Sequence, residues 1–276
     1  MDMNKKLTLS HSKIDTFNQC PQKYKLIYME DMVKLGSQAM KTGIENHENM
    51  KKALTDKTVA LPEKVIPIIN QYFLNPEPVA ESDITVSVNK DIDLRGIIDA
   101  YSIKEDDAYI IDWKTGMIPE NESQLKMYSF ILLASNPNLE RFTAWFYSLE
   151  LDFYKRYTFF YNEVIEYRDK IIEIGDKILS EKEFKKNPTS KCGICPFVYK
   201  CFNEEQIHFA KIINDKDIEK LGEYILLADA YSDQMKTILK TYMLENHINE
   251  IELPKNESRF YLTNTVMMKA GKLKKK

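Results

Sequence analysis

The chain has 276 residues, of which 43% are hydrophobic and 29% are charged. This is enough for one large domain or two modest ones with a hydrophobic core, and it excludes collagen, a coiled coil and wholesale disorder. The formal net charge of −3 excludes a globally basic surface, so nucleic-acid binding would need a local basic patch. No apolar run approaches the roughly 20 residues that span a bilayer, and no signal-peptide core is evident. The sequence predicts a soluble, cytoplasmic protein without membrane contact.

Helical periodicity covers the N-terminal part of the chain. Ser10 is a good N-cap for the first helix, and Pro62 stands near the start of the third. The Asn-Pro-Glu-Pro sequence at 75–78 predicts a turn that ends this region. The predicted helices cover residues 12–30, 38–54 and 62–73.

After that turn the apolar residues alternate with a period of two, which is typical of strands. The acidic turn at 105–107 joins two β-rich runs, so we expect these runs to pair as an antiparallel hairpin. The order of elements predicts an α/β fold, with a central mixed sheet of about five strands flanked by helices. Predicted strands cover residues 84–88, 94–103, 108–113, 141–149 and 154–161, and predicted helices cover 121–135 and 162–185.

The C-terminal part continues well beyond the last cysteine. A helix is predicted over 215–246 and a strand over 259–266, and the lysines at the end are expected to form a solvated basic tail (Lys269, Lys272, Lys274, Lys275 and Lys276). The predicted division is a helical N-terminal region at 1–75, an α/β core at 76–186, a cysteine segment at 187–203 and an α-helical extension at 204–276.

The four cysteines are unevenly spaced. Cys20 stands alone, whereas Cys192, Cys195 and Cys201 lie close together. Two disulfides are an alternative, but a CxxC turn in a chain of cytosolic character is more typical of a metal site, in which Cys20 supplies the fourth thiolate. Zinc and an iron–sulfur cluster both accept four thiolates, so spacing alone leaves both open. The three-plus-one grouping, with prolines after Cys20 and Cys195, favours a cluster.

Two aspartates and a lysine interrupt adjacent apolar strands. Asp112 and Lys114 are two residues apart and share a face, and Asp99 lies beside Asp112 if the two strands are hairpin neighbours. An aspartate at a strand end is often only a turn cap. However, an unpaired carboxylate in an apolar run is costly unless a cation meets it. The pattern therefore predicts a Mg²⁺ or Mn²⁺ site suited to phosphodiester hydrolysis, with the lysine orienting water.

The order of these motifs is more specific than any one of them. It resembles the RecB-like branch of the PD-(D/E)XK nucleases over residues 8–203, in particular the four-cysteine members, namely the CRISPR-associated RecB-like exonucleases and the AddB nuclease-domain type. The motifs are Gly96-x-x-Asp99, Asp112-x-Lys114-Thr115-Gly116, Gln124-x-x-x-Tyr128, and Cys20 with Cys192-x2-Cys195-x5-Cys201.

The resemblance implies a restriction-endonuclease-like core and a [4Fe–4S] cluster on the four cysteines. It also implies that His47 joins Asp99 and Asp112 on the catalytic metal, with the backbone carbonyl of Trp113 as a further ligand. A lone histidine is otherwise usually a surface or core residue, and the remaining ones keep that interpretation (His11, His208 and His247). Glu81 matches an acidic position of some relatives only loosely, and an exposed carboxylate is an equal alternative.

The resemblance further implies that Gln124 and Tyr128, four apart on one helix face, line the active site, with Gln124 touching the DNA. The alternative is that Tyr128 packs into the core. Tyr24, between Lys23 and Lys25, is either a stacking residue for the strand or a core residue.

The predicted function is a Mg²⁺- or Mn²⁺-dependent exodeoxyribonuclease acting on single-stranded DNA or duplex ends, in recombination, replication or CRISPR-type processing. One alternative is an inactive DNA-binding adaptor with a metal-stapled fold. Another is an interaction protein whose residues 202–276 dock a helicase, recombinase or CRISPR integration partner. Extensions like this one occur in phage-type members, so a phage origin, and with it the host cytoplasm, is a further expectation.

Overall fold

A computed structural model describes residues 6–32, 38–56, 59–203, 215–253, 258–262 and 268–272. The chain forms two compact units, Met1–Lys185 and Lys186–Lys276, each of which is described by itself. Within the described residues, every helix is too short or too polar to cross a bilayer.

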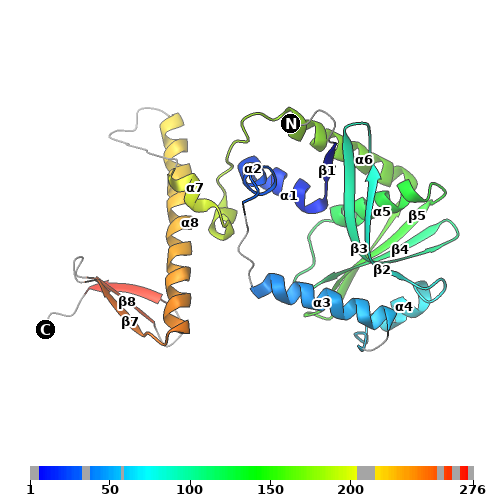
Figure 1. Cartoon of the computed structure of the whole chain (residues 1–276), viewed down its shortest axis with the longest axis horizontal. Helices are drawn as coiled ribbons and strands as arrows, with labels where there is room; N and C mark the ends of the chain where they lie inside the picture. Colours follow the sequence, from blue (N-terminus) through cyan, green and yellow to red (C-terminus); the bar gives the residue numbers. More distant parts are fainter. Residues whose placement is uncertain are drawn as a thin grey trace. The chain divides into compact units, whose positions relative to one another are not determined.

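The first unit contains the predicted α/β architecture, with helices flanking a central mixed sheet (Figure 1). The sheet has six strands, one more than expected, because β1 pairs in parallel with β3. The strands are β1 (Leu7–Leu9), β2 (Val79–Ser87), β3 (Ile92–Lys104), β4 (Asp107–Lys114), β5 (Arg141–Ser148) and β6 (Phe153–Phe160). The helices are α1 (His11–Gln19), α2 (Pro21–Tyr28), α3 (Gln38–Thr55), α4 (Ile66–Tyr72), α5 (Ser123–Ser135) and α6 (Tyr161–Ser180).

The connections explain why the sheet is mixed. The strands run in the order β1-β3-β4-β5-β6, with β2 also paired to β3. The short acidic turn makes β3 and β4 antiparallel, as predicted, whereas β4 and β5 are parallel because α5 crosses over between them. The end of β4 and the start of α5 therefore lie close together, and Lys114 hydrogen-bonds to Gln124 there.

Each face of the sheet has its own core. On one face, Ile110 and Phe142 pack with α5 and α6. On the other face, Ile111, Trp113 and Trp145 pack with residues of α3 and α4. The two cores use alternate residues of β4, which is the period-two pattern that predicted the strand.

The N-terminal helix predicted over 12–30 is wrong in one respect, because it is two helices. Cys20 separates α1 from α2 with an extended backbone (φ −163°, ψ 108°), since a residue before proline avoids the helical region and Pro21 follows. Tyr24 is 3% exposed and packs edge-on against Phe17, with ring centroids 5.5 Å apart. Tyr24 is therefore a core residue and not a stacking surface for DNA.

The second unit contains the cysteine segment and the C-terminal extension. Its long helix α8 (Asp215–Glu245) matches the predicted helix, and the other helical turns are η1 (Ser190–Ile194) and α7 (Val198–Asn203). A three-stranded sheet comprises β7 (Glu250–Leu253), β8 (Ser258–Leu262) and β9 (Met268–Lys272). Residues 263–266 of the predicted strand, His208 and the last three lysines lie outside the described residues. Lys269 and Lys272 belong to strand β9.

Candidate active site

The sheet opens between β3 and β4 at the two aspartates. The ladder of paired residues ends at Ala100 and Ile111, so Asp99 and Asp112 occupy the next position of the register. There the backbone N–H of Trp113 donates to Asp99 Oδ2 over 2.7 Å, and β4 stays paired with β5. A side-chain carboxylate thus replaces the strand partner, and both acidic groups lie at the opening.

The side chains of β2 and β3 switch from one face of the sheet to the other at this same position. Before it, Ala80 and Ala100 are opposite one another, on the side of the sheet that faces α3; beyond it, Ile84 and Ile98 belong to the core on the α5 side. Regular strands would keep residues two apart on one face, so the alternation is interrupted here. Glu81 carries the irregularity in β2, with a left-handed φ of 52°.

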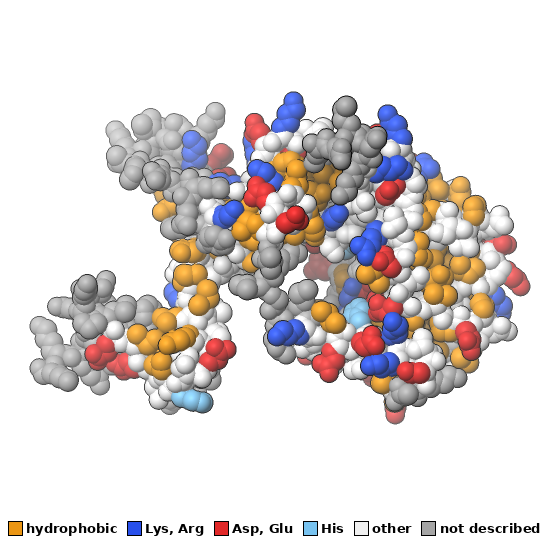
Figure 2. Space-filling model, viewed as in Figure 1, with side chains coloured by type: hydrophobic (Ala, Val, Ile, Leu, Met, Phe, Trp, Pro, Cys, Tyr) orange, Lys and Arg blue, Asp and Glu red, His pale blue; other side chains and the backbone are white. Residues whose placement is uncertain are grey.

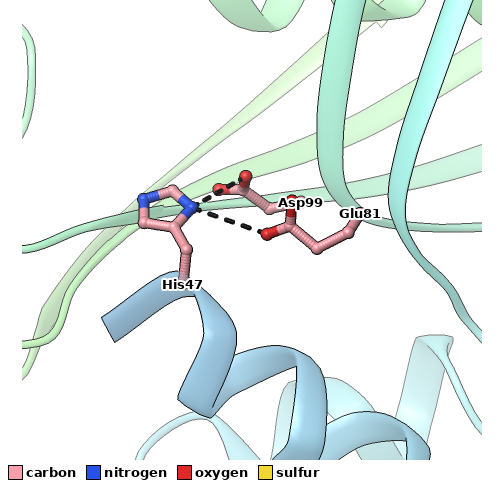
Figure 3. A group of neighbouring side chains, drawn as sticks. All are labelled: His47, Glu81 and Asp99. Atoms are coloured by element: carbon pink, nitrogen blue, oxygen red, sulfur yellow. Dashed lines mark hydrogen bonds and ion pairs between the residues drawn. The ribbon is translucent and has the colours of Figure 1, made fainter. Parts of the chain in front are cut away.

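Helix α3 brings a histidine to these carboxylates (Figure 3). His47 Nδ1 lies 3.0 Å from Asp99 Oδ1 and 3.8 Å from Glu81 Oε1. Among the described residues, these three form the only group of metal-ligating side chains whose ligand atoms all lie within 4.8 Å of one another. The hydrogen bond to Asp99 raises the pKa of His47, and burial raises that of Glu81. One nitrogen and two carboxylate oxygens can hold a divalent cation.

Asp112 belongs to a second set of contacts within the same cavity. Its carboxylate accepts a hydrogen bond from Gln124 Nε2 at 2.9 Å and forms an ion pair with Lys114, with Nζ 2.6 Å from Oδ2. Oδ2 nevertheless has no partner with hydrogen-bond geometry, and the residue is only 1% exposed. Burial, opposed by Lys114, raises the pKa of Asp112 to about 7.

Helix α5 presents Gln124 and Tyr128 to the strands. Gln124 accepts a hydrogen bond from Lys114 Nζ at 2.8 Å and donates one to Tyr128 Oη at 2.8 Å. Tyr128 is 5% exposed, and its ring packs against Gly96. Both alternatives for Tyr128 therefore hold, since its ring is in the core and its hydroxyl is in the site.

These groups line one cavity of about 600 Å³. All the residues predicted for the metal and the chemistry line it, apart from Trp113, whose backbone N–H donates to Asp99. The cavity also includes Glu81, whose half-buried carboxylate lies 3.8 Å from His47. Asp112 is not part of the group formed by His47, Glu81 and Asp99, and its carboxylate contacts Lys114 and Gln124. Metal binding by His47, Asp99 and Asp112 stays a prediction. The lining includes His47, Glu81, Asp99, Asp112, Lys114, Gln124 and Tyr128.

Sequence reasoning missed a second histidine near this cavity. His11 Nε2 lies 3.0 Å from Ser123 Oγ, and His11 lines an adjoining cavity of about 260 Å³ that shares Gln124 and Tyr128 with the first. Burial lowers the pKa of His11, and the charge of Lys114 acts in the same direction. No motif marks this position, because the contact joins α1 to the start of α5.

None of the four cysteines is assigned to a disulfide, so the disulfide alternative is not supported. Cys20 follows α1 in the first unit, whereas Cys192, Cys195 and Cys201 belong to the second. The three-ligand group among the described residues does not include them.

The fold is of the α/β class, and its candidate active site combines a group of side chains that could hold a metal ion with a lysine. The sequence model of the PD-(D/E)XK nuclease superfamily matches residues 35–202, and the chain belongs to this superfamily of phosphodiester hydrolases. No curated protein matches the chain. Among solved structures, it is similar to that of SSO0001, at 15% identity and a TM-score of 0.44, over 76% of this chain and 89% of that chain. This likeness bears on neither substrate nor mechanism.

Proposed function

We propose that this nuclease is a DNA exonuclease that acts on single strands or duplex ends. The observation that carries the proposal is the convergence of His47, Glu81 and Asp99 beside Asp112 and Lys114. A hard-cation site next to a lysine suits hydrolysis of phosphodiesters. The choice of an exonuclease rests on the motif order that the chain shares with RecB-like exonucleases.

The residues of the site divide into two roles. His47, Asp99 and Asp112 would hold Mg²⁺ or Mn²⁺ with the carbonyl of Trp113, and Glu81 would supply an additional oxygen ligand. A divalent ion at this position supplies Lewis acidity and neutralises charge on the phosphoryl group. The fit is supported by the chemistry of the donors and by the buried Oδ2 of Asp112, whose contact with Lys114 Nζ lacks hydrogen-bond geometry.

Lys114 and Gln124 act on the substrate in this proposal. The ammonium group of Lys114 orients the attacking water and stabilises negative charge that develops on the phosphate. Gln124 hydrogen-bonds the DNA strand, and the hydroxyl of Tyr128 holds the amide of Gln124 in place, as it does over 2.8 Å in the structure. Charges of both signs are mixed on the face seen in Figure 2, so the strand would be held by local contacts rather than by a broad basic field.

End-labelled and circular single-stranded DNA, incubated with and without Mn²⁺, test the activity. An exonuclease releases nucleotides from linear DNA and leaves the circles intact. Cleavage of circles at the same rate would contradict the exonuclease assignment. A purified Asp112→Ala protein should retain metal-independent DNA binding but lose cleavage.

The four cysteines would hold a [4Fe–4S] cluster with a structural role, since hydrolysis has no redox step. Support comes from the spacing of the four cysteines. Brown colour and stoichiometric iron in anaerobically purified protein are the expected results, and stoichiometric zinc in a colourless protein is the contrary one.

A DNA-binding adaptor remains the second candidate, and DNA binding without product in the assay above would favour it. The contacts among Asp112, Lys114 and Gln124 favour an active nuclease over an inactive adaptor. We also propose a recombination, replication or CRISPR integration protein as the partner of residues 202–276, and a phage origin with action in the host cytoplasm. Deleting residues 202–276 should abolish such a complex and spare hydrolysis, whereas loss of both would point to a folding role of this segment.

A further inference from the structure

The cysteine segment of the second unit shares its core with the C-terminal helix α8. Val198 of α7 is 1% exposed and packs with Leu227 and Ala230 of α8. Cys192 and Cys201 pack against this small cluster. The extension beyond the last cysteine therefore supplies one wall of the surroundings of these thiols.

The side chain of Gln234, in α8, reaches the CxxC turn. The amide nitrogen of Gln234 lies 3.5 Å from the carbonyl oxygen of Cys192 and 3.3 Å from that of Gly193, and it also donates to the carbonyl of Cys195. The turn has its own backbone hydrogen bond, from Cys195 N to Cys192 O at 3.0 Å. Gln234 thus ties the two cysteine positions of the turn together from outside the segment.

The sulfur of Cys192 is also held within this turn. The backbone N–H of Thr189 donates a hydrogen bond to Cys192 Sγ at 3.4 Å. Cys192 is half-buried and is not in a disulfide. A sulfur that accepts a backbone N–H on a rigid turn has the properties of a metal ligand.

We propose that Gln234 is a positioning residue for a thiolate-bound metal centre on Cys192, Cys195 and Cys201. Its amide holds the turn in the arrangement that the metal needs, so less conformational freedom is lost on binding. Helix α8 is accordingly a structural part of the metal site. The inference rests on the proposed metal binding by these cysteines and is independent of the nuclease site.

The test uses full-length protein reconstituted anaerobically with ferrous iron and sulfide, and in parallel with zinc. Gln234→Glu keeps the length of the side chain but removes the donor, and Gln234→Met does so without adding charge. Lys236→Gln, at an exposed position of the same helix, is the matched control. Three quantities are measured: metal content, visible absorbance, and the rate of metal release to a chelator. Circular dichroism reports whether α8 is intact.

We expect both Gln234 variants to release metal about tenfold faster than wild type at unchanged helicity, and Lys236→Gln to behave as wild type. Hydrogen exchange in the metal-free protein should also be faster at the amides of Cys192 and Cys195 in the Gln234 variants. Release rates equal to wild type in both variants would overturn the role of Gln234. Wild-type protein that takes up neither iron nor zinc would overturn the cysteine metal centre itself, and the inference with it.

Discussion

The side-chain amide of Gln124 donates a hydrogen bond to Asp112 over 2.9 Å, which joins helix α5 to strand β4 inside the candidate active site. The same side chain accepts a hydrogen bond from Lys114 at 2.8 Å. One residue of the helix therefore fixes both the acidic and the basic group of the strand.

Replacement of Gln124 by methionine keeps the length of the side chain and removes these contacts. We expect cleavage of DNA to fall by about 10- to 100-fold, the usual cost of losing a group that orients metal ligands. Steady-state assays with Mn²⁺ measure the loss. Ala134→Gln, at an exposed position of α5, is the control, and equal activity of Gln124→Met and wild type would contradict the role.

When no metal is bound, we expect the ionised carboxylate of Asp112 to lower the stability of the folded protein relative to an Asp112→Asn variant. Burial raises its pKa from 3.8 to about 7, so the folded state binds the proton more tightly than the unfolded chain does. The stability that this proton contributes to the folded state is fully present below about pH 4 and is lost as the pH rises through about 7. With chelator present, Asp112→Asn should be more stable than wild type by a few kcal/mol at pH 8. This expectation follows because each pKa unit between the folded and unfolded states corresponds to about 1.4 kcal/mol of stability.

Urea unfolding at pH 8 and pH 4.5 checks this expectation. The advantage of Asp112→Asn should shrink at the lower pH, where the wild-type carboxyl is protonated in the folded state. A variant that is less stable than wild type at both values would show that the carboxylate is better satisfied than its contacts indicate.

Metal binding should stabilise the fold through His47. A ligand that binds only the folded state raises the unfolding midpoint, so Mn²⁺ should raise the midpoint of wild-type protein. His47→Gln should lose most of that rise. His247→Gln is the matched control, because it is the same change at an exposed position of the second unit. An undiminished rise in His47→Gln would remove this histidine from the ligand set.

The sequence predicted the site better than it predicted the backbone that forms it. The order of elements and the position of Asp99 beside Asp112 follow from the alternation of apolar residues and from the short turn between the two strands. The opening of the sheet does not, because it depends on the amide of Trp113 taking a side-chain carboxylate as partner. The family resemblance matched Glu81 only loosely, because the left-handed backbone of β2 at this residue is not visible in the sequence.

Substitutions at Glu81 can distinguish the effect of backbone strain on stability from the effect of its carboxylate on metal binding. Its φ of 52° lies in the left-handed region, which costs a residue other than glycine about 1–2 kcal/mol. Glu81→Gly and Glu81→Ala both remove the carboxylate, so both should weaken Mn²⁺ binding to the same degree. The glycine variant should be more stable than the alanine variant by about 1 kcal/mol in urea unfolding with chelator. Equal stabilities would mean that the strand is not strained there.

Gly96 lets α5 approach β3 closely. An added Cβ would lie 2.6 Å from Ile131 Cδ1 and 3.1 Å from the ring of Tyr128. The end of Ile131 can move aside, but the ring of Tyr128 is held because its hydroxyl accepts from Gln124. Gly96→Ala should therefore cost about 1–3 kcal/mol of stability and lower cleavage by shifting Gln124.

Gly222 of α8 supplies the matched control for this change, because nothing lies within 4 Å of the Cβ that Gly222→Ala would add. At that helical position the substitution should stabilise by up to about 1 kcal/mol and leave cleavage unchanged. Thermal unfolding and DNA cleavage, measured on both variants, separate the crowding at Gly96 from the general effect of replacing glycine. Gly96→Ala with wild-type activity would mean that α5 can move away from the strand without disturbing the site.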